Sequence, residues 1–213
     1  KIRAAIREDR PYIYVHAHQP AEVGVITMHP HRIGAGESEP LPPFSAGLHP
    51  WDAGTAFDEQ GIIRYLRYSQ IAAVGEIGLD FAVDINREQQ LNIFLKQLHI
   101  AAERSLPAII HCVKAFNETE KELRKYTGRL PGIIMHSYIG SDQQTLTAIK
   151  HGLYVSLSKV SLQSKRTVDS MASVPLDRLF LETDDEDISI KTIYSEAAEK
   201  LSIPMDVLKN GIY

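Results

Sequence analysis

Short apolar segments, each followed by a polar or charged residue, recur along the whole chain. Segments that are rich in β-branched residues and apolar at nearly every position are typical of strands buried on both faces, as in a parallel sheet covered by helices. Eight segments have this character: Tyr12–Val15, Val23–Met28, Phe44–Leu48, Ile71–Val74, Ala108–Ile110, Gly132–Met135, Leu153–Leu157 and Leu179–Leu181. The pattern therefore predicts eight buried strands.

Helical spacing of apolar residues lies between the later strands. It is clearest in Arg87–Arg104, where Asn86 and Gln89 resemble a capping box at the start. The apolar residues that set the spacing are Leu91, Phe94, Leu95, Leu98, Ala101 and Ala102. A second helix is predicted over Asp142–His151, opened by an aspartate cap and closed by Gly152. Strands thus alternate with helices, which predicts βα units.

The length of the chain limits the architecture that these units can form. With 213 residues the chain lies at the low end of a closed (β/α)₈ barrel, which needs roughly 200 to 250. No internal repeat or low-complexity linker divides it, so we expect one α/β domain over residues 1–213. We predict a trimmed TIM-type barrel whose early helices are reduced or missing, because residues 19–22 are too few for a helix and the next connection is rich in Pro and Gly.

The composition excludes several classes of protein. No apolar run approaches the roughly 20 residues of a membrane span, and residues 1–10 lack the apolar stretch of a signal peptide, so we expect a cytoplasmic protein with no membrane contact. Nothing in the sequence indicates an obligatory protein partner. A formal net charge of −4 argues against a broad basic surface for duplex nucleic acid. It does not exclude a nuclease, because bound cations can attract phosphate.

Histidines and carboxylates stand at the ends of the predicted strands. His16 and His18 occupy alternate positions, which face the same side of a strand, so both imidazoles can reach one ion. Cys112 is the only cysteine, so a metal would be held by imidazole and carboxylate groups. In a barrel these strand ends converge on the C-terminal rim. The predicted metal ligands are His16, His18, Glu76, His111, His136 and Asp184.

The coincidence of six such residues carries this prediction, because a single histidine after a buried strand is more often a hydrogen-bonded core residue. His29, His31 and His49 are weaker candidates. His99 and His151 lie within or at the end of predicted helices, where solvated histidines are common, and are left out. Four imidazoles with two carboxylates suit Zn²⁺, Mn²⁺, Fe²⁺ or Ni²⁺.

Several motifs together resemble the TatD family of metal-dependent deoxyribonucleases, within the amidohydrolase-like barrels, over nearly the whole chain. The matching segments are His16-Ala-His18, Gly47–Trp51, Val74–Asp80, Pro107–Cys112, His136–Ser141 and Glu182–Asp184. The resemblance implies a nuclease that cleaves DNA at phosphodiester bonds, from an end, with two divalent cations drawn from Zn, Mn, Mg, Fe or Ni. It also implies the ligand sets: His16 and His18 with Asp184 at one ion, Glu76 as the bridge, and His111 and His136 at the other.

Catalytic and substrate-binding roles follow from this assignment. Asp184 is expected to be both ligand and general base, acting with Glu76 on a metal-activated water. The family commonly has a basic residue beyond the fifth strand, which makes Lys114 the candidate phosphate contact, although a solvated loop lysine fits equally well. Glu182 should face away from Asp184 and support a ligand. Asp80 could orient either Lys114 or a ligand histidine.

Two other functions stay open at this point. Related barrels with the same ligands hydrolyse small amides, esters or lactones, and such an activity predicts a closed apolar pocket without phosphate-binding groups. A non-catalytic metal-binding protein is suggested only by Tyr14, which stands where the family usually has Asp two residues before the first histidine.

Overall fold

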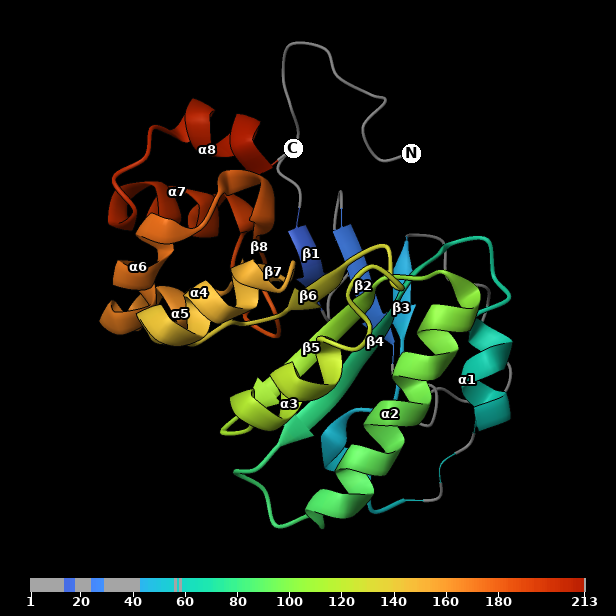
Figure 1. Ribbon diagram of the computed structural model, residues 1–213. Helices are drawn as coiled ribbons and strands as arrows, with labels where there is room; N and C mark the ends of the chain where they lie inside the picture. The colour runs from blue at the N-terminus through green and yellow to red at the C-terminus, as the bar shows by residue number, and fades with distance from the viewer. Residues whose placement is uncertain (1–13, 18–23, 29–42, 56, 58, 213) are drawn as a thin grey trace.

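The computed structural model describes the backbone of residues 14–17 and 24–28 and all atoms of residues 43–55, 57 and 59–212. Eight parallel strands form one sheet in the order of the chain, each hydrogen-bonded to the next (Figure 1). They are β1 Tyr14–Ala17, β2 Gly24–Met28, β3 Phe44–Ala46, β4 Ile71–Asp80, β5 Ala108–Val113, β6 Ile133–Met135, β7 Tyr154–Leu157 and β8 Leu179–Leu181. Residues of β1 also lie within 8 Å of β8, Cα to Cα, so the two edges of the sheet approach each other. The predicted α/β fold, with parallel strands in chain order and helices after the later strands, is confirmed.

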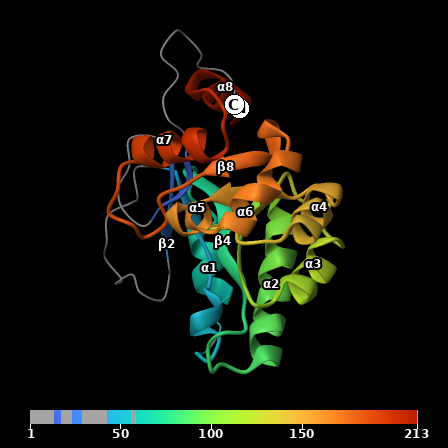
Figure 2. The same cartoon turned by 90° about the vertical axis from the view of Figure 1, so that its left-hand side faces the viewer.

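From β3 onward every strand is followed by helix. The helices are α1 Glu59–Tyr65, α2 Arg87–Arg104, α3 Phe116–Leu123, α4 Asp142–Lys150, α5 Lys159–Gln163, α6 Lys165–Ser170, α7 Ile190–Lys200 and α8 Met205–Ile212. Short 3-10 turns cover η3 Pro50–Asp52, η4 Met171–Ser173 and η5 Leu176–Arg178. In Figure 1, α1 and α2 lie to the right of the strands, α4 to α8 lie to the left, and α3 lies below β5; the turned view again shows α7 beside β8 (Figure 2). Most of the connections after β1 and β2, where reduced helices were predicted, lie outside the described residues.

The caps of the two predicted helices differ in one respect from the expectation. Asn86 accepts from the backbone N–H groups of Glu88 and Gln89, as predicted for α2. The aspartate cap of α4 was wrong: Ser141 is the cap and forms a capping box with Gln144. Serine fits this position because its hydroxyl accepts the N–H three residues on, whereas an aspartate in the first turn favours the helix dipole.

Two buried glutamines on α2 fix the ends of β3 and β4. The Gln97 side chain accepts from the N–H of Leu48 and donates to its carbonyl, at 2.7 and 3.1 Å. Gln90 does the same for Asp80, with both distances 2.8 Å. Gln90 is 1% exposed and Gln97 is 0% exposed. Their hydrogen bonds are therefore shielded from water, and losing them would be costly. The helix therefore holds the backbone from which candidate site residues project.

No helix among the residues described in the structure is both long and apolar enough to cross a membrane.

Candidate metal centre

Three donor atoms converge at the C-terminal ends of neighbouring strands. Nε2 of His136 lies 2.8 Å from Oε2 of Glu76, and Nδ1 of His111 lies 3.6 Å from the same oxygen. The two imidazole nitrogens are 3.2 Å apart. Glu76 and His136 are 3% and 7% exposed, so the cluster is shielded from bulk water. The structure thus brings together three of the six predicted ligands.

The outer nitrogen of each imidazole contacts a second carboxylate. Nε2 of His111 lies 3.2 Å from Oδ2 of Asp80, and Nδ1 of His136 lies 3.3 Å from Oε1 of Glu182. If these nitrogens carry the protons that they donate, the inner nitrogens keep lone pairs directed at Glu76. Carboxylates that fix ligand histidines in this way are the usual surroundings of protein-bound metals. Of the two roles considered for Asp80, the geometry favours orienting a histidine.

Hydrogen bonds and opposite charges within this network shift the pKa values of Asp80 and His136. Burial by itself raises the pKa of Asp80, but hydrogen bonds from His111, Trp51 and the Ala82 N–H outweigh it and lower the pKa to about 2. Burial lowers the pKa of His136, yet the carboxylates of Glu76 and Glu182 more than compensate, so its pKa lies well above 6.5. The two carboxylates that raise the pKa of His136 would also attract a cation at this place.

Two glycines allow Glu76 to lie against β5. A Cβ atom at Gly75 would come within 2.6 Å of the Ile109 Cβ, and one at Gly78 would collide with the His111 carbonyl oxygen. Gly78 also has a φ of 151°, which L side chains rarely adopt. These two positions explain the Gly-Glu-Ile-Gly segment: β4 approaches β5 closely enough to place the carboxylate beside the imidazole.

Asp184 ends β8 on the same side of the sheet. Ligand atoms of Asp184, Glu182 and His136 all lie within 4.8 Å of one another, and a second group of this kind is His49, Glu76 and His111. Asp184 is half-buried and has a φ of 54°, and Ser137 and Lys114 at the ends of β6 and β5 have φ values of 42° and 53°. Left-handed backbone at non-glycine residues is strained and gathers at functional sites.

Glu182 contacts both the ring of His136 and the backbone next to it. It is fully buried, and its Oε1 also accepts the backbone N–H of Ser137 at 2.6 Å. Its other oxygen, Oε2, is buried with no hydrogen-bond partner among the described residues. A buried carboxylate oxygen left in this state is costly unless a positive charge lies nearby. The supporting role expected for Glu182 agrees with these contacts. The expectation that Glu182 faces away from Asp184 was wrong, because ligand atoms of the two residues lie within 4.8 Å of each other.

His49 was only a weaker candidate and Trp51 was not predicted as a site residue, although the family motif that contains both was recognised. His49 is 6% exposed, and its Nε2 lies 3.6 Å from Glu76 Oε2. The Trp51 indole N–H donates to Asp80 Oδ2 at 2.7 Å. Since Trp51 and Asp80 are separated by 29 residues, no local pattern shows this contact. The His-Pro-Trp triplet after a buried strand was the available signal.

The remaining predicted ligands cannot be placed by side chain. His16 lies in β1, of which only the backbone is described, and His18 lies outside the described residues. Their assignment as metal ligands stays a prediction.

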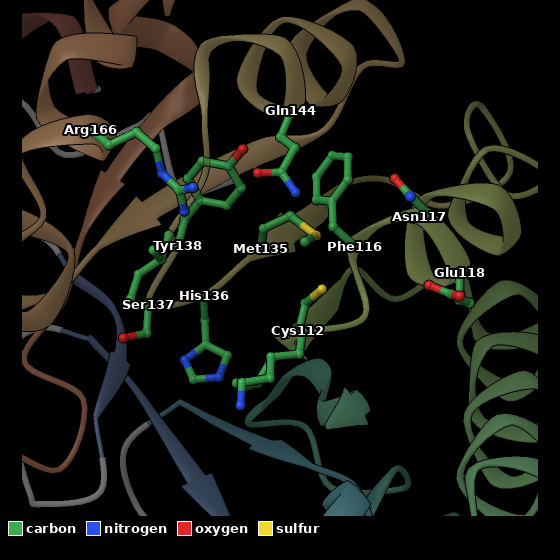
Figure 3. Close-up of a pocket in the computed structure, with 13 residues that line it drawn as sticks. Cys112, Phe116, Asn117, Glu118, Met135, His136, Ser137, Tyr138, Gln144 and Arg166 are labelled. Carbon is green, nitrogen blue, oxygen red and sulfur yellow. The ribbon is translucent and has the colours of Figure 1, made fainter. Parts of the chain in front are cut away.

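A pocket of about 440 Å³ opens beside the cluster (Figure 3). His136 and Cys112 form part of its wall, Phe116 stands opposite Tyr138, and the Arg166 side chain extends over Tyr138. Polar and charged groups contribute to the lining: Lys114, Asn117, Glu118, Gln144 and Arg166. Lys114 therefore shares a pocket with a candidate metal ligand.

The geometry of the donor atoms fits a divalent metal. An ion with donors at about 2.1 Å in tetrahedral array separates them by roughly 3.4 Å, and the three separations here are 2.8, 3.2 and 3.6 Å. Two imidazoles with a carboxylate are donors that first-row transition metals accept. The cluster is thus compatible with divalent metal binding.

The chain is similar to known proteins in both sequence and fold. The family model described as TatD related DNase matches residues 26–200. The 3'-5' ssDNA/RNA exonucleases TatD of Cronobacter sakazakii and Escherichia coli are 35% and 30% identical over 146 residues, which are 66% of this chain and 56% of each relative. The chain thus matches little more than half the length of these relatives. A TatD homologue from Escherichia coli K12 has a TM-score of 0.77 at 21% identity over 94% of both chains, and a TatD family hydrolase from Entamoeba histolytica has 0.72 at 16% over 95% of both. These two structures share the fold.

Proposed function

The chain belongs to the TatD family of DNases, and on this basis we propose that it is a metal-dependent hydrolase that cleaves DNA phosphodiester bonds with a metal-activated water. The observation that carries the proposal is the convergence of Glu76, His111 and His136, each histidine held by a second carboxylate. Hydrolysis of a phosphodiester needs a nucleophile and a means of stabilising the phosphoryl charge, and bound divalent cations supply both.

Two cations are proposed, with the assignment that the family resemblance implies. Glu76 would bridge them, His111 and His136 would hold one, and Asp184 would hold the other with the two histidines of the first strand. Asp80 and Glu182 would fix the rings of His111 and His136 so that their inner nitrogens stay unprotonated toward the ions. Zn, Mn, Mg, Fe and Ni are the candidates.

Asp184 is proposed as the general base. Its position at the end of β8, close to His136 and Glu182, allows one carboxylate oxygen to face the cation and the other to take a proton from the attacking water. Its left-handed backbone turns the residue away from the regular strand direction. The other catalytic carboxylate, Glu76, would stay ionised as the ligand shared between the cations.

Lys114 is proposed to contact a substrate phosphate. It is exposed on the pocket that includes His136, and Arg166 lines the same pocket. These two cations, with only Glu118 as an acidic group in the lining, favour a phosphodiester over the small amide, ester or lactone, which would be expected to bind in an apolar pocket. The curated relatives are named as exonucleases of single-stranded DNA and RNA, and we propose DNA, cleaved from an end, as the substrate here. A cytoplasmic location belongs to the same proposal.

The test is cleavage of end-labelled single- and double-stranded DNA with EDTA and after adding back Mg²⁺, Mn²⁺ or Zn²⁺. The variant Asp184→Asn should lose metal-dependent cleavage, because it loses the base and a metal ligand. Asp187→Asn is the matched control, an exposed acid of the same loop. Absence of cleavage in protein shown to hold metal would refute the nuclease, and the small amides, esters and lactones would then be assayed.

A further inference from the structure

Trp51 is the only tryptophan of the chain, and its side chain is 54% exposed beside the candidate metal centre. It lies in η3, directly after the buried His49. Large aromatic side chains that serve only the core are usually buried much further. Packing in the core therefore does not explain why so much of Trp51 is exposed.

The indole ring is held firmly even though half of it faces solvent. Its N–H donates to Asp80 Oδ2 at 2.7 Å, and the backbone N–H of Trp51 donates to His49 Nδ1 at 3.2 Å. The His49 ring meets the indole edge-to-face, with centroids 4.8 Å apart and planes at 84°. Because its partners are buried, the exposed surface is presented in one orientation.

This surface lies close to the predicted chemistry. The Trp51 ring centroid is 6.2 Å from that of His111, and His111 in turn lies 5.3 Å from His136. Trp51 is not part of the pocket that His136 and Lys114 line. The metal ligands therefore have a pocket that contains Lys114 and Arg166 next to His136, and an aromatic surface next to His111.

We infer that the exposed face of Trp51 stacks on a nucleobase of single-stranded nucleic acid whose phosphate occupies the metal centre. The inference rests on the proposed nuclease function and names how that site holds its substrate. Stacking is available to every base, since each has a π face, so Trp51 contributes affinity without sequence preference. A paired base in the interior of a duplex has no free face, so the same contact favours single strands and unpaired ends.

A different role for Trp51 would be to hold Asp80, which orients His111. Two substitutions separate the roles. Trp51→Phe keeps an aromatic face and loses the N–H, whereas Trp51→Leu loses both. Stacking predicts that Leu raises the KM for an oligonucleotide by about 5- to 150-fold, and that Phe restores most of the affinity. A role only through Asp80 predicts that Phe and Leu are equally impaired, chiefly in metal affinity and kcat.

The experiment uses metal-loaded protein and tryptophan fluorescence, excited at the long-wavelength edge of the indole band where the nine tyrosines absorb little, so that the emission reports Trp51. A phosphorothioate-linked dT₁₀, which resists hydrolysis, should quench the emission, and an abasic oligomer with the same backbone should quench it far less. In parallel, the KM of each variant is measured for single-stranded DNA and for an abasic strand of the same length, which has a phosphodiester backbone but no ring to stack. Trp51→Leu should affect the first much more than the second. Val207→Ala, an exposed apolar change on α8, is the control.

Equal quenching by the abasic oligomer, or an unchanged KM for DNA in Trp51→Leu, would overturn the inference while leaving the nuclease in place. Loss of all metal-dependent hydrolysis in the wild type, of both substrates, would instead refute the proposed function and the inference with it. Thermal melting of each variant confirms that it is folded, as expected for substitution of a half-exposed side chain.

Discussion

Replacing Asp80 with asparagine tests whether the carboxylate behind His111 prepares the metal centre. Asp80 is 3% exposed and accepts three hydrogen bonds: from Trp51 at 2.7 Å, from the Ala82 N–H at 2.8 Å and from His111 at 3.2 Å. Asparagine has nearly the same size but offers a single carbonyl oxygen and no charge. The ring of His111 should then lose its fixed orientation, although its own position in β5 is unchanged.

Two separate effects are expected. The decrease in the pKa of Asp80 from the ordinary value of 3.8 to about 2 corresponds to about 2.5 kcal/mol, at about 1.4 kcal/mol per pKa unit, and concerns the stability of the metal-free fold. Loss of a carboxylate that holds a ligand histidine typically weakens metal binding about 10- to 100-fold, which is about 1.4 to 2.7 kcal/mol. Asp80→Asn should therefore cost about 2 kcal/mol in metal-binding free energy.

The assay is titration of Mn²⁺ or Zn²⁺ against a competing chelator, with Asp84→Asn, an exposed acid in the loop after β4, as the control. Stability should change too: because the folded pKa of Asp80 is lowered, its contribution is present above about pH 4 and is lost as the pH falls through 2. Denaturant unfolding of the wild type and Asp80→Asn should therefore differ at pH 7 and converge in acid. A metal affinity within twofold of the wild type would refute the reasoning.

Three further predictions concern the same rim. The pKa of His136 is raised, and a metal must displace its proton. The apparent metal affinity should therefore rise with pH, by up to about tenfold per pH unit below that pKa, and calorimetry should show proton release on binding. A metal affinity independent of pH would contradict this prediction. Without metal, the stabilisation from protonated His136 is present below pH 6.5 and lost as the pH rises through the higher folded pKa. Gly78→Ala should lower the free energy of unfolding more than Gly128→Ala, as measured by denaturant unfolding. Both glycines have a positive φ, but only Gly78 lacks space for a Cβ. Equal losses of stability would argue against the close packing of β4 on β5. Lys114→Ala should raise the KM for DNA by more than Lys121→Ala on α3. Similar KM values for the two variants would show that Lys114 is a solvated loop lysine that does not contact the substrate.

The eight strands were predictable because each is apolar on both faces, and α2 because its apolar residues keep the helical period over about three turns. The end of β4 was not. Ile71–Val74 carries the apolar signal, but the strand continues to Asp80 through glycines that normally weaken strands. They are tolerated here because only hydrogen fits against Ile109 and the His111 carbonyl, a contact between strands that the sequence of one strand does not show.

The candidate site was predictable as a set of strand ends, since parallel strands bring their carboxyl ends to one rim. Its internal contacts were not predictable. Whether Asp80 faces Lys114 or His111 depends on rotamers set by packing, and His49 reaches Glu76 only because α2 holds the adjoining backbone through Gln97. Such contacts join residues far apart in sequence, and a single sequence carries no signal for them.

Anomalous diffraction from crystals of the protein grown with Mn²⁺ or Zn²⁺ tests the central claim most directly. The account predicts a peak about 2.0 to 2.2 Å from Oε2 of Glu76, Nδ1 of His111 and Nε2 of His136, with a second peak beside Asp184. The same crystals soaked in EDTA should lose both. Metal bound elsewhere, or no peak at this cluster in protein that hydrolyses DNA, would contradict the assignment of these strand ends as the catalytic centre.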